Sequence, residues 1–428
     1  MGGIVSRLCG EIKLPRMLKV KQHFDPSCIK KDDIPKAVFD ELSKPELADA
    51  IKPGMRIAVT CGSRGVANIA VITRAITDYV KSKGAHPFVV PAMGSHGGAS
   101  AEGQKALLAS YGVTEESAGC PIHSSMETVS LGKTKAPVYE VRLDKHAAQA
   151  DGIIAAGRIK PHTDFHGEYE SGIMKMLAIG LGKRDGADIC HQFGFGRMAE
   201  MVLLFGKAII ENAPVIMGFG ILENAYSQTY KVAAMPAGEI EKREPQLLKE
   251  ARSRLPFLPF ETCDVLVVDK FGKDISGLGM DPNITGASPC TPFVKSGFSA
   301  ARTVVLDLTK ETHGTAMGIG AADVITRRLF NKIDFEASYV NAITSRGIDY
   351  VRIPLIADND REAIQTALRT CIGIDKDNPR IIRITDSIHT EIFYISEVLE
   401  DEAVKKNLEI LESPGGWKFN EEGNLWQD

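Results

Sequence analysis

The stretch KPHTDFHGEYESGIMK, residues 160–175, carries two histidines and a lysine that lies between two methionines. The imidazoles of His162 and His166 suit proton transfer, because histidine titrates near neutral pH. Lys175 has apolar neighbours, and a partly desolvated amine becomes nucleophilic and ready for a covalent adduct. The alternatives are a hydrogen-bonded loop histidine and a lysine whose stem crosses apolar surface to reach water. His166 is the weaker candidate, because DFHGE is typical of a solvent-facing loop.

Two further histidines lie outside this stretch. His96 stands among the glycines of MGSHGGAS, which would let a ligand approach the backbone, and the loop leads into an expected helix. His191 follows Lys175 by 16 residues and is a candidate metal ligand. A single histidine is too few for a zinc or iron site made by protein alone, so such a metal needs most of its ligands from another source. A turn histidine at 96 and a core, phosphate-binding or helix-end histidine at 191 remain alternatives.

Four charged or titratable side chains follow predicted strands. Arg64 comes after residues 56–62, His96 and His162 after the next two strands, and Lys273 after residues 264–272. Ligands of open α/β sheets bind beyond the carboxyl ends of the strands. If two domains face each other, these four side chains line one cleft.

The elements that position these residues repeat one order, an apolar strand, a Gly-rich or polar turn, and an amphipathic helix. This alternation predicts a largely parallel α/β sheet. The predicted strands are 56–62, 86–93 and 151–159, and the predicted helices are 68–84, 101–112 and 171–183.

The order breaks near residue 253, where SRLPFLPFETCD contains two prolines and little periodicity. We therefore expect two α/β domains with mainly parallel sheets that face a shared active-site cleft. The expected boundaries are 1–255 for the catalytic and cofactor-binding domain and 256–428 for the domain that closes the cleft. The later segments 264–272, 302–308, 349–357 and 379–387 are predicted strands, and 318–333 and 360–373 are predicted helices.

Composition excludes several classes of protein. The 428 residues are 44% hydrophobic and 25% charged with a net charge of −4, and no basic stripe indicates a nucleic-acid partner. No apolar run is long enough for a membrane span, and the first residues lack the apolar core of a signal peptide. Eight cysteines form no CxxC pair, so we expect a reduced, cytoplasmic protein. The Gly pairs give no complete dinucleotide fingerprint.

Four stretches together resemble the lactate racemase family of nickel-pincer-dependent isomerases, in a divergent branch. They are TCGSRG, GSHG, GRIKPHTDFHGEYESGIMK continued to His191, and DKFGKDISG. The order Pro-His, Ser-Gly-x-x-Lys and His is the specific part of the resemblance.

The resemblance implies a nickel pyridinium-3,5-bisthiocarboxylic acid mononucleotide, bound covalently to Lys175 with His191 as the protein ligand of nickel. It implies that His96 and His162 act as acid and base on opposite faces of a 2-hydroxy acid. Hydride transfer to the pincer group and back then racemises the substrate. Arg64 and Lys273 would hold the substrate carboxylate. Further cofactor contacts are implied at three positions, Ser63, Gly94 and Gly172.

Two departures from the family pattern change the expected substrate. Cys61 stands where the family often has an aspartate, and the loop before Lys175 is longer and adds His166, Glu168 and Glu170. We expect both changes to line the substrate side and to favour a hydroxy acid larger or more polar than lactate.

The sequence is also compatible with other functions. They are a pincer-dependent oxidoreductase or lyase, a non-enzymatic cofactor- or phosphate-binding protein, and an α/β protein with structural histidines. Expected partners are the hydroxy acid and the cofactor-synthesis enzymes. A homo-oligomer is compatible with the sequence.

Overall fold

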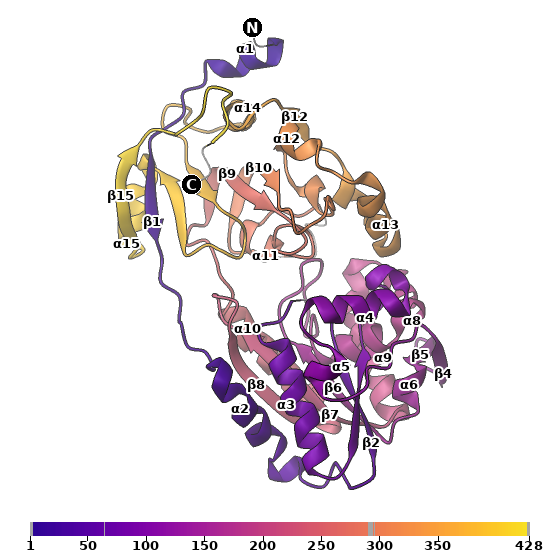
Figure 1. The fold of residues 1–428 in the computed structure, drawn as a ribbon. Coiled ribbons are helices and arrows are strands. Elements are labelled where there is room, and N and C mark those ends of the chain that lie inside the picture. The colour runs from indigo at the N-terminus through magenta and orange to yellow at the C-terminus, as the bar shows by residue number, and fades with distance from the viewer. Residues whose placement is uncertain (1–2, 64, 290–293, 295, 426–428) are drawn as a thin grey trace. The chain divides into compact units, whose positions relative to one another are not determined.

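The computed structural model describes residues 3–63, 65–289, 294 and 296–425 (Figure 1). The chain divides into two compact units, each described here by itself. The central unit is Asp25–Leu255, and the terminal unit combines Met1–Phe24 with Pro256–Asp428. Residues 1–24 thus differ from the expected boundaries, because strand β1 (Met17–Lys21) pairs with strands near the C-terminus. The facing of two domains across a cleft stays a prediction.

The central unit is built on a sheet with the order β3-β2-β6-β7-β8 within the described residues. The first four strands are parallel, and β8 returns antiparallel to β7. The chain runs from β2 outward to β3 and later continues on the other side of β2 with β6, so the strand order reverses between β2 and β6. Such a reversal is where open α/β sheets place their ligands. The strands are β2 (Arg56–Cys61), β3 (His86–Pro91), β6 (Gly152–Arg158), β7 (Val215–Glu223) and β8 (Thr229–Pro236).

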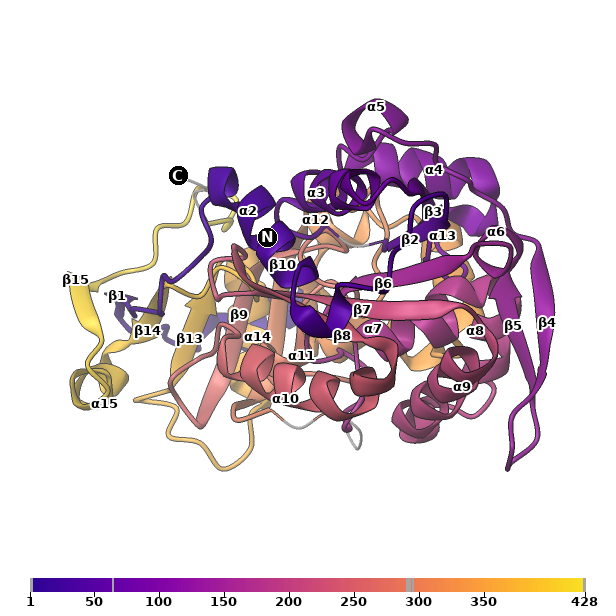
Figure 2. The ribbon, with the colours of Figure 1, turned by 90° about the horizontal axis from the view of Figure 1, so that it is seen from below.

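Helices cover both faces of this sheet (Figure 2). Alternate residues of β2 point to opposite faces: Ile57 and Val59 pack with α2 and α3, whereas Ala58 belongs to the core that contains α9 and α10. All three side chains are fully buried, so β2 is an interior strand on both faces. A separate hairpin of β4 (Thr128–Lys133) and β5 (Glu140–Asp144) completes the unit. The helices are α2 (Ile34–Leu42), α3 (Ile69–Ser82), α4 (Ala101–Ser110), α5 (Glu115–Ala118), α6 (Lys145–Ala148), α7 (Ile173–Lys175), α8 (Lys183–His191), α9 (Met198–Asn212) and α10 (Ile240–Ser253).

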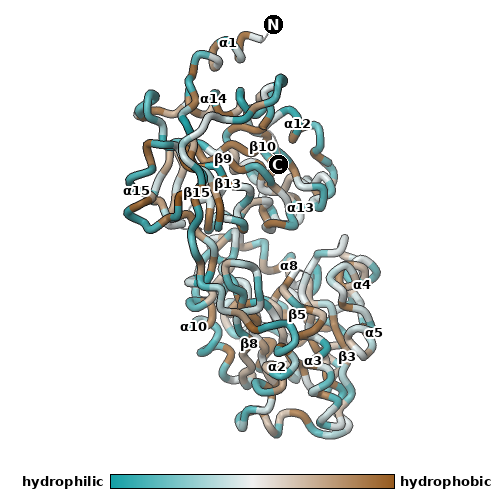
Figure 3. The backbone as a smooth tube through the Cα atoms, turned by 60° about the vertical axis from the view of Figure 1, so that its left-hand side comes forward, coloured by the Kyte–Doolittle hydropathy of each residue, from teal (hydrophilic) through white to brown (hydrophobic). Residues whose placement is uncertain are grey.

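The terminal unit contains a mixed sheet with the order β12-β11-β10-β9-β13-β14-β1-β15 in its described part. The strands from β12 to β13 are parallel, and β14, β1 and β15 are antiparallel. Strands β9 and β10 contain hydrophobic residues (Figure 3), in agreement with the full burial of Val265, Leu266, Val304 and Val305. The α/β class with mainly parallel sheets is therefore confirmed. The further elements are β9 (Thr262–Phe271), β10 (Ser299–Leu308), β11 (Val324–Thr326), β12 (Leu355–Ala357), β13 (Ile381–Ile384), β14 (Ile392–Ser396), β15 (Glu409–Gly415), α1 (Ile4–Gly10), α11 (Pro282–Thr285), α12 (Arg327–Phe330), α13 (Phe335–Ser345), α14 (Asp360–Thr370) and α15 (Glu400–Lys405).

Two predicted elements of the terminal unit are wrong in part. The predicted helix 318–333 contains strand β11 before the short helix α12, because its Val-Ile-Thr run is fully buried between β10 and β12. The predicted strand 349–357 is a 3-10 turn (Ile348–Val351) followed by the three residues of β12. None of the helices in the described residues combines the length and apolar character that a membrane span requires.

Candidate functional site

The loops at the carboxyl ends of β2, β3 and β6 carry the candidate residues of the central unit. Ser63 follows β2, His96 follows β3 and His162 follows β6, as the sequence predicts. Arg64 lies outside the described residues. Parallel neighbouring strands bring these loops to one edge of the sheet, which includes the reversal point between β2 and β6.

His162 and Lys175 meet directly. Nε2 of His162 and Nζ of Lys175 form a hydrogen bond. The backbone N–H of Asp164 donates to Nδ1 of His162 at 3.0 Å, and the Asp164 carboxylate lies 3.5 Å from the same nitrogen. The His162 ring stacks on Phe165 with 4.2 Å between ring centroids, and Lys175 Nζ lies 5.9 Å from the Phe165 centroid. The structure thus brings together two of the residues singled out by sequence.

A buried carboxylate, Glu170, shapes the loop that carries His162. It accepts hydrogen bonds from the backbone N–H of His162 at 2.7 Å and of Gly167 at 3.0 Å. Arg252 donates to it at 2.6 Å from α10. Glu170 is 0% exposed, so the expectation that it lines the substrate side is wrong.

Cys61, the other expected change on the substrate side, is also buried. It belongs to a core cluster at the end of β2, and burial raises the pKa of its thiol to about 12. A side chain buried in the core does not line the substrate side, so this expectation is wrong as well. Of the departures from the family pattern, His166 is half-buried and Glu168 is exposed.

The backbone around Lys175 is not a regular α-helix. The short α7 passes into a π-helical segment, η4 (Met176–Leu181), which continues into α8. Such irregular turns within helices occur often at functional sites. Met176, the next residue after Lys175, packs against glycines at the ends of two strands. A Cβ at Gly157 would lie 2.5 Å from Met176 Cγ, and one at Gly62 would lie 3.4 Å from Met176 Cε. Lys175 is thereby held beside the carboxyl ends of β2 and β6.

Glu244 of α10 holds the start of the Lys175 helix. Its carboxyl group accepts the backbone N–H of Met174 at 2.9 Å and also bonds the N–H of Ile173. Burial raises the pKa of Glu244 to about 8. Gly172 makes this approach feasible, because a Cβ there would lie 2.0 Å from Glu244 Oε1. The structure thus gives Gly172 a packing role, and its contact with a cofactor stays a prediction.

Glu244 is not among the candidate residues that the sequence predicts. The helix spacing contains the missing signal. The buried side of α10 is Ile240, Glu244, Leu247, Leu248 and Ala251, so one glutamate stands in register with the apolar residues.

The His96 loop is attached to the same helical segment. Ser63 Oγ lies 2.5 Å from His96 Nδ1, so the loops after β2 and β3 are linked by a hydrogen bond. The N–H of Gly94 donates to the carbonyl of Gly180 in η4 at 3.2 Å. A Cβ at Gly94 would lie 3.2 Å from Ile179, and its φ of +58° is one that glycine adopts easily. Ser63 and Gly94 therefore position His96, and their cofactor contacts stay predictions.

His191 is the last residue of α8, and its ring centroid lies 6.4 Å from that of Phe195. Burial raises the pKa of the neighbouring Cys190 thiol to about 12, although the charge of Lys175 acts in the opposite direction. Among the residues that the structure describes, no three His, Cys, Asp or Glu side chains form a metal-binding group. The role of His191 as a metal ligand stays a prediction.

Lys273 lies in the terminal unit, after β9. Its backbone N–H donates to Thr312 Oγ1 at 3.0 Å, and its amine donates to Asn341 Oδ1 on α13 at 2.6 Å. Its role in holding a substrate carboxylate stays a prediction.

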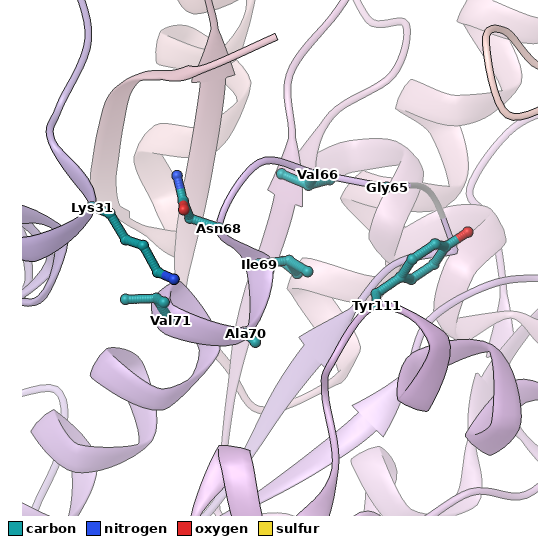
Figure 4. Close-up of a pocket in the computed structure, with 8 residues that line it drawn as sticks. All are labelled: Lys31, Gly65, Val66, Asn68, Ile69, Ala70, Val71 and Tyr111. Carbon is teal, nitrogen blue, oxygen red and sulfur yellow. The ribbon is translucent and has the colours of Figure 1, made fainter.

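A pocket adjoins the turn after β2 (Figure 4). Lys31 and Tyr111 stand on opposite sides of the start of α3 in this view. The Tyr111 hydroxyl donates to the carbonyl of Ser63 at 2.9 Å, which supports the turn that leads to His96. The lining residues are Lys31, Gly65, Val66, Asn68, Ile69, Ala70, Val71 and Tyr111.

The fold and the site define a two-unit α/β protein in which a lysine and a histidine meet at the edge of a largely parallel sheet where the strand order reverses. Residues 11–201 match the family model of the lactate racemase N-terminal domain, so the resemblance expected from the sequence is confirmed over this part of the chain. None of the curated proteins matches the sequence.

Two solved structures are similar to the chain. The lactate racemase apoprotein of Thermoanaerobacterium thermosaccharolyticum has a TM-score of 0.49 and 14% identity, over 87% of this chain and 98% of that one. A structural-genomics target protein of Thermotoga maritima has a TM-score of 0.47 and 11% identity, over 66% of this chain and 72% of that one.

Proposed function

We propose that this protein is a racemase or epimerase of a 2-hydroxy acid that works with a nickel-pincer nucleotide bound to Lys175. The observation that carries the proposal is the hydrogen bond between His162 and Lys175, within the segment that matches the lactate racemase N-terminal domain. A proton-transfer group and a cofactor anchor must lie side by side in such an enzyme, because the reacting carbon has to meet both.

The donor set suits this cofactor. The described residues offer no three-ligand metal group, whereas a pincer nucleotide brings sulfur, carbon and sulfur of its own and needs one imidazole, here His191. The Lys175 amine is partly buried beside Phe165, surroundings that favour a covalently bound lysine over a hydrated one. When bound, the group supplies reversible hydride acceptance from the α-carbon of the substrate.

His162 takes or returns the hydroxyl proton of the substrate at Nε2, and when Nε2 takes the proton, Nδ1 must carry its own proton toward the Asp164 carboxylate. Its Nε2 points to Lys175, where the cofactor is anchored, and its Nδ1 faces Asp164. The Asp164 carboxylate at 3.5 Å stabilises the positive charge that the ring acquires with the proton. Asp164 was absent from the residues expected by sequence, although it stands two positions after the histidine.

His96 serves as the second proton-transfer group, on the other face of the substrate. Its ring is oriented by Ser63, and its loop is fixed to η4 through Gly94. Arg64 and Lys273 hold the substrate carboxylate in this proposal. The exposed Glu168 and the half-buried His166 favour a hydroxy acid larger or more polar than lactate.

The test begins with intact-protein mass spectrometry and metal analysis of protein co-expressed with the cofactor-synthesis enzymes. We expect an added mass on the peptide that contains Lys175 and about one nickel per chain, both lost in Lys175→Ala. The matched control is Lys207→Ala, whose exposed lysine pairs with Glu241 on the surface.

The loaded protein is then supplied with single enantiomers of a panel of hydroxy acids. Loss of optical purity without net keto acid or alkene supports the proposal. Net keto acid or alkene would instead identify an oxidoreductase or a lyase. An unmodified chain without nickel, despite competent synthesis enzymes, would refute the proposal.

A further inference from the structure

A fully buried lysine, Lys183, has no part in the proposed mechanism. It is the first residue of α8, and its side chain and that of Asp144 are both 0% exposed. An ammonium group has three N–H bonds. Three oxygens surround Nζ of Lys183, namely the carbonyl of Pro91 at the end of β3, Oε1 of Gln104 at 3.1 Å and Oδ2 of Asp144 at 3.2 Å.

The carboxylate of Asp144 compensates the charge of the buried lysine. Burial lowers the pKa of Lys183, and the carboxylate of Asp144 opposes that shift. The second carboxylate oxygen of Asp144 accepts the N–H groups of His146 and Ala147 at 2.8 and 2.9 Å, so Asp144 is itself fixed to the start of α6. Oδ2 of Asp144 meets Lys183 as an ion pair without a hydrogen bond of its own, so the charge of the buried lysine is compensated mainly by this contact.

Gln104 extends the cluster to the candidate site. It lies on α4 and is 0% exposed. Its Oε1 accepts from Lys183, and its Nε2 donates to the carbonyls of Gly94 at 3.0 Å and of His96 at 3.2 Å. Both ends of the amide are therefore used, one on the lysine and one on the loop that carries His96.

The position of Lys183 in the chain connects the His96 loop, through Gln104, with the helices that carry Lys175 and His191. Lys183 comes two residues after the end of η4, the segment that follows Lys175, and it is the first residue of the helix that ends at His191. Its φ of +54° is rare for a residue with a side chain, which indicates that its contacts hold the backbone in this conformation.

We propose that Lys183 and Gln104 are positioning residues that fix the His96 loop to the helices carrying Lys175 and His191. The proposal rests on the proposed function, because it takes His96 as a proton-transfer group. Its test does not measure turnover. A failure of this positioning role can therefore be distinguished from a failure of the proposed racemase activity.

The experiment is nitrogen NMR of the full-length protein with 15N-labelled histidine. The His96 signals are assigned by their loss in His96→Gln. The variant is Gln104→Met, which keeps the length of the side chain and removes its hydrogen bonds. We expect the two ring nitrogens of His96, distinct in the parent because Ser63 fixes one tautomer, to move toward the average of exchanging tautomers. Ser63→Ala is the positive control, since it removes the hydrogen bond to the ring directly.

A variant that only lowers the stability of the fold must not shift the ring-nitrogen signals of His96. Val80→Ala provides this control, because Val80 is fully buried in α3 within the core of the opposite sheet face. If Gln104→Met does not fold, Gln104→Glu replaces it: the carboxylate still accepts from Lys183 but repels the carbonyls of Gly94 and His96. His96 signals that coincide with those of the parent in the folded Gln104 variant, while Ser63→Ala shifts them, would overturn the proposal.

Discussion

Glu244 should make the stability of this protein fall as the pH rises. Burial raises the pKa of its carboxyl group from 4.5 to about 8, with the backbone N–H groups of Met174 and Ile173 acting against the rise. The folded protein therefore binds this proton more tightly than the unfolded chain does. Between about pH 4.5 and pH 8 the unfolded chain loses the proton first, so each increase in pH favours unfolding.

The size of the effect follows from these two values. Relative to a protonated group, the unfavourable contribution of Glu244 to folding is about 1.4 kcal/mol at pH 5.5 and about 4.6 kcal/mol at pH 8.5. Glu244→Gln cannot ionise, so its stability should lose this pH dependence and gain about 3 kcal/mol relative to the parent between the two pH values. The difference between the two pH values is independent of any free-energy cost, equal at both pH values, of placing the glutamine side-chain amide beside the N–H of Ile173.

The assay is urea unfolding of the parent and of Glu244→Gln at pH 5.5 and at pH 8.5. Glu241→Gln is the matched control, because Glu241 lies on the same helix with a half-exposed side chain that pairs with Lys207. We expect the control to follow the parent at both pH values. Equal pH dependence of the parent and Glu244→Gln would refute the reasoning and show that Glu244 ionises as readily in the folded protein as in the unfolded chain.

Three further predictions concern the site. Asp164→Asn should lower kcat about 10- to 100-fold with KM nearly unchanged, since it removes the negative charge beside His162; racemisation followed by polarimetry tests this, and an unchanged kcat would contradict it. His191→Ala should retain the added mass on Lys175 but lose nickel, whereas nickel at the parent level would exclude His191 as the ligand. Arg252→Met should lower the free energy of unfolding by about 1 to 2 kcal/mol, because Glu170 loses its charged donor; denaturant titration measures this, with the exposed Arg197→Met as control.

The sequence predicted the parts of the fold that depend on local pattern. Apolar runs predicted strands β2, β3, β6, β9 and β10. The position after a predicted strand indicated His96 and His162 as candidate site residues. Chemical type and apolar surroundings marked Lys175, which the structure places against His162. These features are readable because a buried strand and its terminal loop are adjacent in the chain.

Hydrogen-bond partners that lie far apart in the sequence could not be predicted from it. Glu244 holds a helix about 70 residues away, and Arg252 reaches Glu170 over 82 positions. Glu170 and Cys61 were expected at the substrate side because they depart from the family pattern, and only the packing shows that they are buried. The strand β11 was mistaken for helix, since three residues between two turns carry too little pattern to separate the alternatives.

The pairing of β1 has a consequence for how the chain is made. Met17 pairs with Ser396, 379 positions later, and the central unit is completed in between (Figure 1). During synthesis β1 is made first but cannot pair until β14 and β15 have been made. The central unit can therefore fold before the sheet that contains β1 is complete. Chains that stop short of these strands should therefore hold a folded central unit and an unpaired β1 edge, which is a template for aggregation.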